Sequence, residues 1–236
     1  MRLDYVKRCS RFVHDYATFV KELPESFSEI GAMLPSSRYL AKEMVRPIRE
    51  VNRQTRNSRP YRILEVGPGT GPFTKKILKL MPVTDELVVC EINARLMERL
   101  KLSLSTLDVY QAKQHKIDFF EGSVLDLPED LINDGFDLIV SSLPFHNFNP
   151  DLVEHFLEFF SKILTPTGTI TFFHYVGLRH LSEFSPNREL RDRIKGVDSV
   201  IANWCENASQ NGLIKKKISM LNFPPAVSIS VTGSKI

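Results

Sequence analysis

The sequence has little cysteine and no long apolar run. Its three cysteines, Cys9, Cys90 and Cys205, lie far apart and form no C-x-x-C pair. This excludes a cysteine zinc cluster and suits a reducing compartment. No stretch reaches the roughly 18 apolar residues of a membrane-spanning helix, and the charged N-terminus lacks a signal-peptide core. We therefore expect a cytoplasmic protein, which leaves contact with a membrane surface open.

The chain also lacks a strong excess of charge of either sign. With 31 Lys and Arg against 28 Asp and Glu, the net charge is only +3, so the field of the whole molecule says little about partners. A hydrophobic content of 42% with 25% charged residues is ordinary globular composition and argues against extended disorder. A chain of 236 residues can bury a full core. We predict an N-terminal extension over residues 1–56 and one α/β domain over residues 57–236.

The stretch from Tyr61 to Gly71 reads Y-R-I-L-E-V-G-P-G-T-G, and the rest of the domain is organised around it. Its apolar residues are typical of a buried parallel strand that ends where the glycines begin. The glycines allow a tight turn and close approach of a ligand, and residues 73–81 have helical spacing. Such a strand–loop–helix unit binds a nucleotide-like ligand beside the helix N-terminus. A dinucleotide fingerprint has its third glycine one residue later.

Two acidic residues define the chemistry expected at this loop. Glu65 directly precedes it, and Glu91 ends a second apolar run, Leu87–Cys90. At the carboxyl edge of its strand, Glu91 can accept both hydroxyls of a ribose. An acid inside the loop disfavours a pyrophosphate and suits a ligand with a positive centre. The alternative is a tight turn that binds nothing. Loop, acids and strand order together resemble the S-adenosylmethionine (SAM) site of the seven-strand methyltransferases.

Strands and helices alternate along the remainder of the chain. The apolar patterns predict strands over residues 117–120, 136–141, 169–176, 213–221 and 226–232, and helices over residues 93–106, 150–164 and 187–211. We expect Asn149 to cap the helix that starts at Pro150. The fold class that follows is α/β, a three-layer, doubly wound, seven-stranded and mostly parallel sheet of the Rossmann-like kind. It closes with an antiparallel hairpin and carries N-terminal helices.

The N-terminal extension carries two amphipathic patterns. Residues 3–23 predict a helix that either packs on protein or lies in a membrane interface. A second helix is predicted over residues 38–54. Its basic stripe continues past its end: Arg38, Lys42, Arg46, Arg49, Arg53 and Arg56. The stripe is either a solvated face with local ion pairs or, as we favour, a contact for a phosphate-bearing surface of lipid or nucleic acid.

Four stretches together carry a family resemblance. They are G-A-M-L-P-S-S at Gly31–Ser37, L-E-V-G-P-G-T-G-P-F-T at Leu64–Thr74, S-S-L-P-F-H-N-F at Ser141–Phe148 and N-F-P-P-A at Asn222–Ala226. From about residue 19 onward the chain resembles the bacterial phospholipid N-methyltransferases, which methylate phosphatidylethanolamine. The resemblance implies SAM as cofactor, S-adenosylhomocysteine (SAH) as product, and phospholipid head groups on an anionic membrane as partners. It also implies a peripheral location at the inner face of the membrane.

A weaker resemblance concerns the segment Ser142–Phe145. It is similar to the N-[IL]-P-[FY] motif of the rRNA adenine dimethyltransferases, with serine in place of asparagine. In that motif a side-chain oxygen and a backbone carbonyl contact the amine, and the aromatic ring stacks on the base. RNA is therefore the alternative acceptor, and the basic stripe suits it equally. Against RNA, no helical RNA-binding domain follows the predicted hairpin.

The family resemblance implies roles for individual residues. The cofactor-binding set is Glu65, Gly67, Pro68, Gly69, Thr70, Gly71, Glu91, Ile92, Ser123, Val124 and Ser141. Ser142 and Leu143 are expected to border the transferred methyl group, and either His146 or Tyr175 to accept the proton that an ammonium must lose before attack. The reaction requires no metal, and the spacing of His, Asp and Glu shows no ligand cluster.

Overall fold

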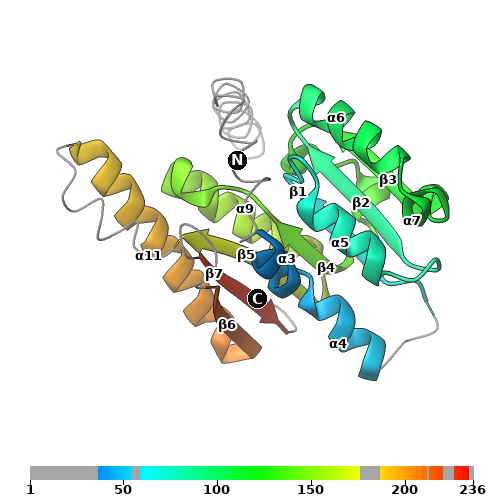
Figure 1. Ribbon diagram of the computed structural model, residues 1–236. Coiled ribbons are helices and arrows are strands. Elements are labelled where there is room, and N and C mark those ends of the chain that lie inside the picture. Colours follow the sequence, from blue (N-terminus) through cyan, green and yellow to red (C-terminus); the bar gives the residue numbers. More distant parts are fainter. Residues whose placement is uncertain (1–36, 55–58, 176–186, 212, 220–225, 234–236) are drawn as a thin grey trace.

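The computed structural model describes residues 37–54, 59–175, 187–211, 213–219 and 226–233. Its seven-stranded sheet has the order β3-β2-β1-β4-β5-β7-β6 (Figure 1). The strands are β1 (Arg62–Val66), β2 (Glu86–Glu91), β3 (Ile117–Glu121), β4 (Phe136–Ser141), β5 (Leu164–Tyr175), β6 (Leu213–Ser219) and β7 (Ala226–Thr232). The first five strands run parallel, and β7 pairs antiparallel with both β5 and β6. The predicted fold class is confirmed.

Helices cover both faces of this sheet. They are α3 (Ser37–Met44), α4 (Arg46–Gln54), α5 (Pro72–Leu80), α6 (Ala94–Ser105), α7 (Asp108–Gln111), α8 (Glu129–Ile132), α9 (Pro150–Ile163) and α11 (Arg188–Asn211), with 3₁₀ turns η1 (Gln114–Lys116), η2 (Val124–Asp126) and η3 (Phe145–Asn147). Side chains alternate between the two faces of the sheet along a strand. Ile63 of β1 therefore packs in one apolar core with α3 to α6, and Leu64 packs in a second core with α9 and α11. Two cores flank one sheet, which gives the three layers.

The second predicted helix is wrong in one respect, because residues 38–54 form two helices rather than one. The chain breaks at Val45, between α3 and α4. Pro47 explains the break, since proline has no N–H for a helical hydrogen bond and its ring clashes with the preceding turn. The expected apolar face is nevertheless there: Leu40, Met44 and Ile48 are buried against the α5 side of the sheet.

Part of the basic stripe is neutralised locally. Arg46 lies 3.7 Å from a Glu43 carboxylate oxygen and 3.6 Å from one of Glu50. Glu50 in turn accepts from Lys215 on β6, at 3.1 Å. These ion pairs are the local pairing that the alternative interpretation of the stripe requires. The predicted helix over residues 3–23 and the segment 222–225 lie outside the described residues.

Two further contacts fix the helices on the sheet. The Thr171 hydroxyl of β5 donates to the Met44 carbonyl oxygen at 2.8 Å, which anchors the end of α3. Asn149 is the N-cap residue of α9 and Pro150 its first helical residue, as predicted, although the Asn149 side chain makes no capping hydrogen bond. None of the helices in the described part of the chain is long and apolar enough to cross a membrane.

Candidate cofactor and acceptor site

The site lies where the strand order reverses, between β1 and β4. In open α/β sheets, ligands bind at the carboxyl ends of strands beside such a switch point. Val66, the last residue of β1, pairs with Cys90 of β2 on one side and with Ser141 of β4 on the other. Backbone hydrogen bonds continue this register into the loops, from Gly67 N to Cys90 O at 2.9 Å and from Ser142 N to Val66 O at 2.8 Å. The loops after β1, β2 and β4 therefore meet at one edge.

The glycine loop combines tight packing with an open side. Gly67, Gly69 and Gly71 have φ values of 68°, 55° and 82°, in the left-handed region that L side chains rarely adopt. A Cβ on Gly71 would lie 2.3 Å from Cδ1 of the buried Leu100, so this glycine packs directly on α6. A Cβ on Gly69 would meet nothing within 4 Å. The backbone at Gly69 thus borders free space, as a loop that cradles a ligand must.

Glu91 lies beside the loop, as its position at the end of β2 predicts. One carboxylate oxygen accepts from Gly69 N at 3.2 Å and the other from Asn93 N at 3.0 Å. The side chain is 5% exposed. Burial raises the pKa of Glu91, while the N–H groups of Asn93, Gly69 and Ile92 act in the opposite direction. The carboxylate is therefore held against the loop by backbone donors, with its orientation fixed.

Glu65 is the more unusual of the two acids. Its side chain is fully buried, and neither carboxylate oxygen makes a hydrogen bond of standard geometry within the described residues. Burial raises its pKa to about 8; the hydroxyl and N–H of Thr74 in the first turn of α5 lower it, and the charge of Glu91 raises it further. A buried acid that makes no well-formed hydrogen bond costs free energy. A cationic ligand at the loop would compensate this cost, which is the fit expected for the positively charged end of SAM.

The other residues predicted to bind the cofactor on this side lie in the segments that follow β1, β2 and β3. Pro68 is buried in the loop and Thr70 is half-buried. Ile92 packs on the core cluster that contains the buried Val124. The Ser123 hydroxyl accepts from Leu125 N at 3.3 Å, so it caps η2. Ile92, next to Glu91, and Val124 thus belong to one apolar cluster, and their contact with an adenine stays a prediction.

The segment after β4 forms the opposite wall. The Ser141 hydroxyl is buried and accepts from Leu143 N at 3.4 Å. The Leu143 side chain packs on the glycine loop, since a Cβ on Gly67 would lie 3.3 Å from its Cδ2. The Ser142 hydroxyl oxygen is buried, and no described residue bonds to it. On this wall, the Ser142 hydroxyl therefore lies beside the cradle with no hydrogen-bond partner among the described residues.

His146 and Tyr175 are the alternative proton acceptors predicted from the sequence. His146 in η3 is 8% exposed, and its Nε2 lies 2.8 Å from Oδ1 of Asp198 on α11. The ring of His174 on β5 lies 5.8 Å from the His146 ring, centroid to centroid. Burial first, and His146 second, lower the pKa of His174. The side chain of Tyr175 lies outside the described residues, so its role stays a prediction.

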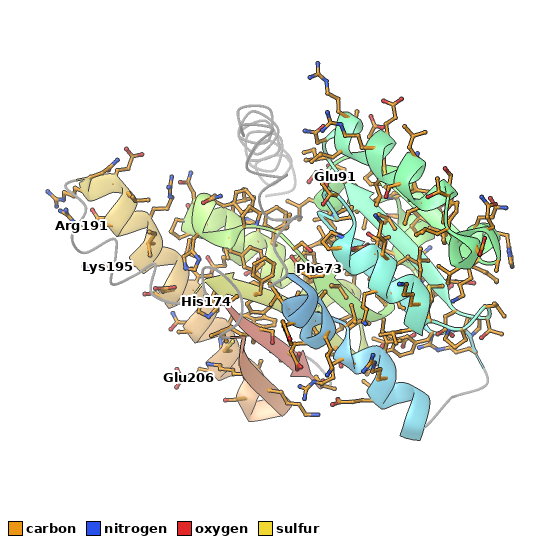
Figure 2. The ribbon with its side chains drawn as sticks, viewed as in Figure 1. Phe73, Glu91, His174, Arg191, Lys195 and Glu206 are labelled. Atoms are coloured by element: carbon orange, nitrogen blue, oxygen red, sulfur yellow. The ribbon has the colours of Figure 1, made fainter. Side chains whose placement is uncertain are left out.

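Sequence reasoning did not find Asp198 or assign a role to His174. The two residues lie on α11 and β5, and they reach His146 only through the fold (Figure 2 labels His174). No spacing in the sequence announces this cluster. Residues 146 and 198 are 52 positions apart, so only the tertiary structure brings them together.

Comparisons with known proteins agree with this geometry. Residues 63–168 match the methyltransferase domain family. The chain therefore carries a methyltransferase domain, within the fold of the class I SAM-dependent methyltransferases. Its cofactor is SAM, in agreement with the buried Glu65 and the open face of Gly69. No curated protein sequence matches the chain.

Solved structures share the fold at low sequence identity. The plantazolicin methyltransferase BpumL in complex with SAH is 12% identical, with a TM-score of 0.60 over 98% of each chain. A protein provisionally assigned as a caffeoyl-CoA O-methyltransferase from Staphylococcus aureus is 16% identical, with a TM-score of 0.58 over 98% of this methyltransferase and 100% of that chain. A provisionally assigned O-methyltransferase from Klebsiella pneumoniae is 15% identical, with a TM-score of 0.53 over 84% and 80%.

Proposed function

We propose that this methyltransferase transfers a methyl group from SAM to the amine of an aminophospholipid, phosphatidylethanolamine or its partly methylated forms, at an anionic membrane surface. The similar structures are named for plantazolicin and caffeoyl-CoA, so a shared fold does not choose the acceptor. The lipid proposal rests on the sequence resemblance and on the wall formed by residues 141–148. We further propose that the protein is peripheral at the inner face of the membrane.

The observation that carries amine methylation is the Ser142 hydroxyl, which has no partner in the described part of the chain. Its oxygen is buried beside the glycine loop, where an acceptor must approach the cofactor. Bound SAM supplies a methyl group that its sulfonium already activates. The protein then has to hold the amine in line and exclude water. Ser142 can accept a hydrogen bond from an amine N–H and thereby fix its direction, while Leu143 fills the apolar space against Gly67.

Phe145 weighs against RNA as the acceptor. A base-stacking role needs an exposed ring face, but Phe145 is 1% exposed and packs on Phe172 at 5.4 Å between centroids. This differs from the expectation drawn from the N-[IL]-P-[FY] motif, because the aromatic ring here belongs to the core. The ion pairs of Arg46 also reduce the charge available to a polyanion.

Labelled SAM with defined acceptors tests the proposal. Vesicles of phosphatidylethanolamine with an anionic lipid should become labelled, whereas phosphatidylcholine vesicles, already fully methylated, should not. Structured RNA is the second arm of the same assay. Protein that binds SAH but labels no lipid would refute the lipid proposal, and label in RNA alone would replace it.

A further inference from the structure

Two imidazoles and one carboxylate converge at the β4–β5 end of the sheet. His146, His174 and Asp198 each offer one ligand atom, and these three atoms lie within 4.8 Å of one another. The residues come from η3, β5 and α11; Figure 1 labels β5 and α11, and Figure 2 labels His174. They are far apart in the sequence, and the cofactor cradle uses none of them. This is the only group of its kind within the described residues.

The elements that carry the three side chains are fixed to one another by aromatic contacts. Phe145 of η3 lies 5.4 Å from Phe172 of β5, and Phe172 lies 6.0 Å from Trp204 of α11. On α11, Val197 directly before Asp198 is fully buried. A Cβ on Gly196 would lie 2.5 Å from Pro150 Cγ, so α11 packs closely on α9. The ligand-bearing backbones are therefore preorganised, and only side chains need to adjust.

The distances suit a small ion after a minor adjustment. Nitrogen and oxygen ligands lie about 2.0–2.2 Å from Zn²⁺, which places tetrahedral ligand atoms roughly 3.3 Å apart. The His146–Asp198 pair, at 2.8 Å, would widen slightly, and the longer separations in the cluster would shorten. Two imidazoles with one carboxylate select borderline-soft transition metals, whereas Mg²⁺ and Ca²⁺ prefer sites built from oxygen.

We propose that His146, His174 and Asp198 form a binding site for a divalent transition metal such as Zn²⁺. Three protein ligands leave at least one coordination position open, as in catalytic rather than structural zinc sites. The site lies on the β5 side of the switch point, whereas Glu91 lies on the β2 side. An acceptor oxygen, such as a head-group phosphate, is a suitable ligand for the open position. This last step rests on the proposed function, and metal binding itself does not.

Metal binding excludes the proton-acceptor role predicted for His146. An imidazole that coordinates an ion through Nε2 cannot take a proton at the same atom. In the structure, the same nitrogen forms a hydrogen bond with Asp198. The two roles therefore differ in what removal of the metal does to activity. If the ion holds the acceptor, chelation lowers turnover. If His146 acts as a base, chelation raises turnover or leaves it unchanged.

Calorimetric titration of the full-length, chelator-treated protein with Zn²⁺ alone tests the site. We expect one ion per chain, with micromolar or tighter affinity, and no heat with Mg²⁺. His146→Gln, His174→Gln and Asp198→Asn should each weaken Zn²⁺ binding at least tenfold. The matched control is His115→Gln, an exposed histidine of η1, which should change the affinity less than twofold.

SAH affinity serves as the folding control, because no member of the cluster belongs to the cofactor cradle. Each variant should bind SAH within about threefold of the unmodified protein. If a variant fails this control, the visible absorption of bound Co²⁺ in the unmodified protein reports nitrogen–oxygen coordination without any substitution. Zn²⁺ binding that survives all three substitutions, or no binding to the unmodified protein, overturns the proposal. Tight binding with unchanged lipid methylation after chelation supports the site and removes its link to the acceptor.

Discussion

The two halves of the sheet edge are built on different principles. On the β1–β2 half, backbone groups dominate: glycines with positive φ and N–H donors hold Glu91, and Glu65 is buried beside them. On the β4–β5 half, side chains from separate elements meet, with the Ser142 hydroxyl and the cluster of His146, His174 and Asp198. A backbone-built half suits a constant ligand, and a side-chain-built half suits an acceptor that varies among relatives of one fold.

The largest effect expected to distinguish the two halves is the pH dependence of the free energy of unfolding caused by Glu65. Its pKa rises from an ordinary 4.5 to about 8 in the folded state. At pH values between 4.5 and about 8, Glu65 is therefore protonated in the folded protein and ionised in the unfolded chain. The free energy of unfolding should fall with rising pH across that window, by roughly 3–5 kcal/mol in total. Glu65→Gln should remove this slope, measured as the difference in urea unfolding between the two proteins from pH 5 to pH 8.

Next in size is the contrast between two glycines of the loop. Gly71→Ala should destabilise folding by roughly 2–4 kcal/mol, since it adds a left-handed alanine and overpacks Leu100. Gly69→Ala should cost only about 1–2 kcal/mol of stability, yet lose most SAH affinity because its methyl enters the cradle. Denaturant titration and calorimetry separate the two. Equal losses of stability would contradict the assignment of Gly69 to the open side.

Glu91 provides the third comparison. Glu91→Ala should weaken SAH binding by about 1.5–3 kcal/mol, or roughly 10–100-fold, because a charged hydrogen-bond acceptor is lost. Cys90→Ala, one residue earlier and buried in the opposite core, should leave the affinity within threefold. Calorimetry on both variants checks this. Equal effects would contradict the ribose role.

The smallest expected effect is on the acceptor half. Ser142→Ala should lower kcat by about five- to tenfold, in line with one hydrogen bond of about 1 kcal/mol, and leave SAH affinity unchanged. Ser105→Ala, an exposed serine of α6 that bonds to Leu102 O, is the control. A loss of SAH affinity in Ser142→Ala would instead indicate that this serine contributes to cofactor binding.

The difference between the halves also explains what the sequence could predict. Glu65 and Glu91 lie at the carboxyl ends of β1 and β2, and the glycines directly follow β1, so a local pattern alone is enough to place them at one edge of the sheet. Hydrophobic periodicity likewise predicts the strands and the closing hairpin. Pro47 alone would have predicted the break between α3 and α4. The basic and apolar periodicity continues without interruption through residues 38–54, however, and favoured a single helix.

The acceptor half depends on packing that no local pattern encodes. Phe145 lies in a motif that predicts an exposed ring, yet its contact with Phe172 places it in the core. Asp198 reaches His146 only because α11 packs on α9 and η3, and no spacing along the chain indicates which face of that helix meets η3. Chemistry that joins distant side chains therefore becomes visible only in the folded molecule.

The most direct test of the central claim is the proton balance of SAH binding. The account holds that Glu65, buried and largely protonated at neutral pH, becomes ionised when the cationic end of the cofactor reaches the loop. Calorimetry at pH 7 in buffers of different ionisation enthalpy should show net proton release, and Glu65→Gln should abolish most of it. Tight SAH binding with no proton release from the unmodified protein would contradict the account.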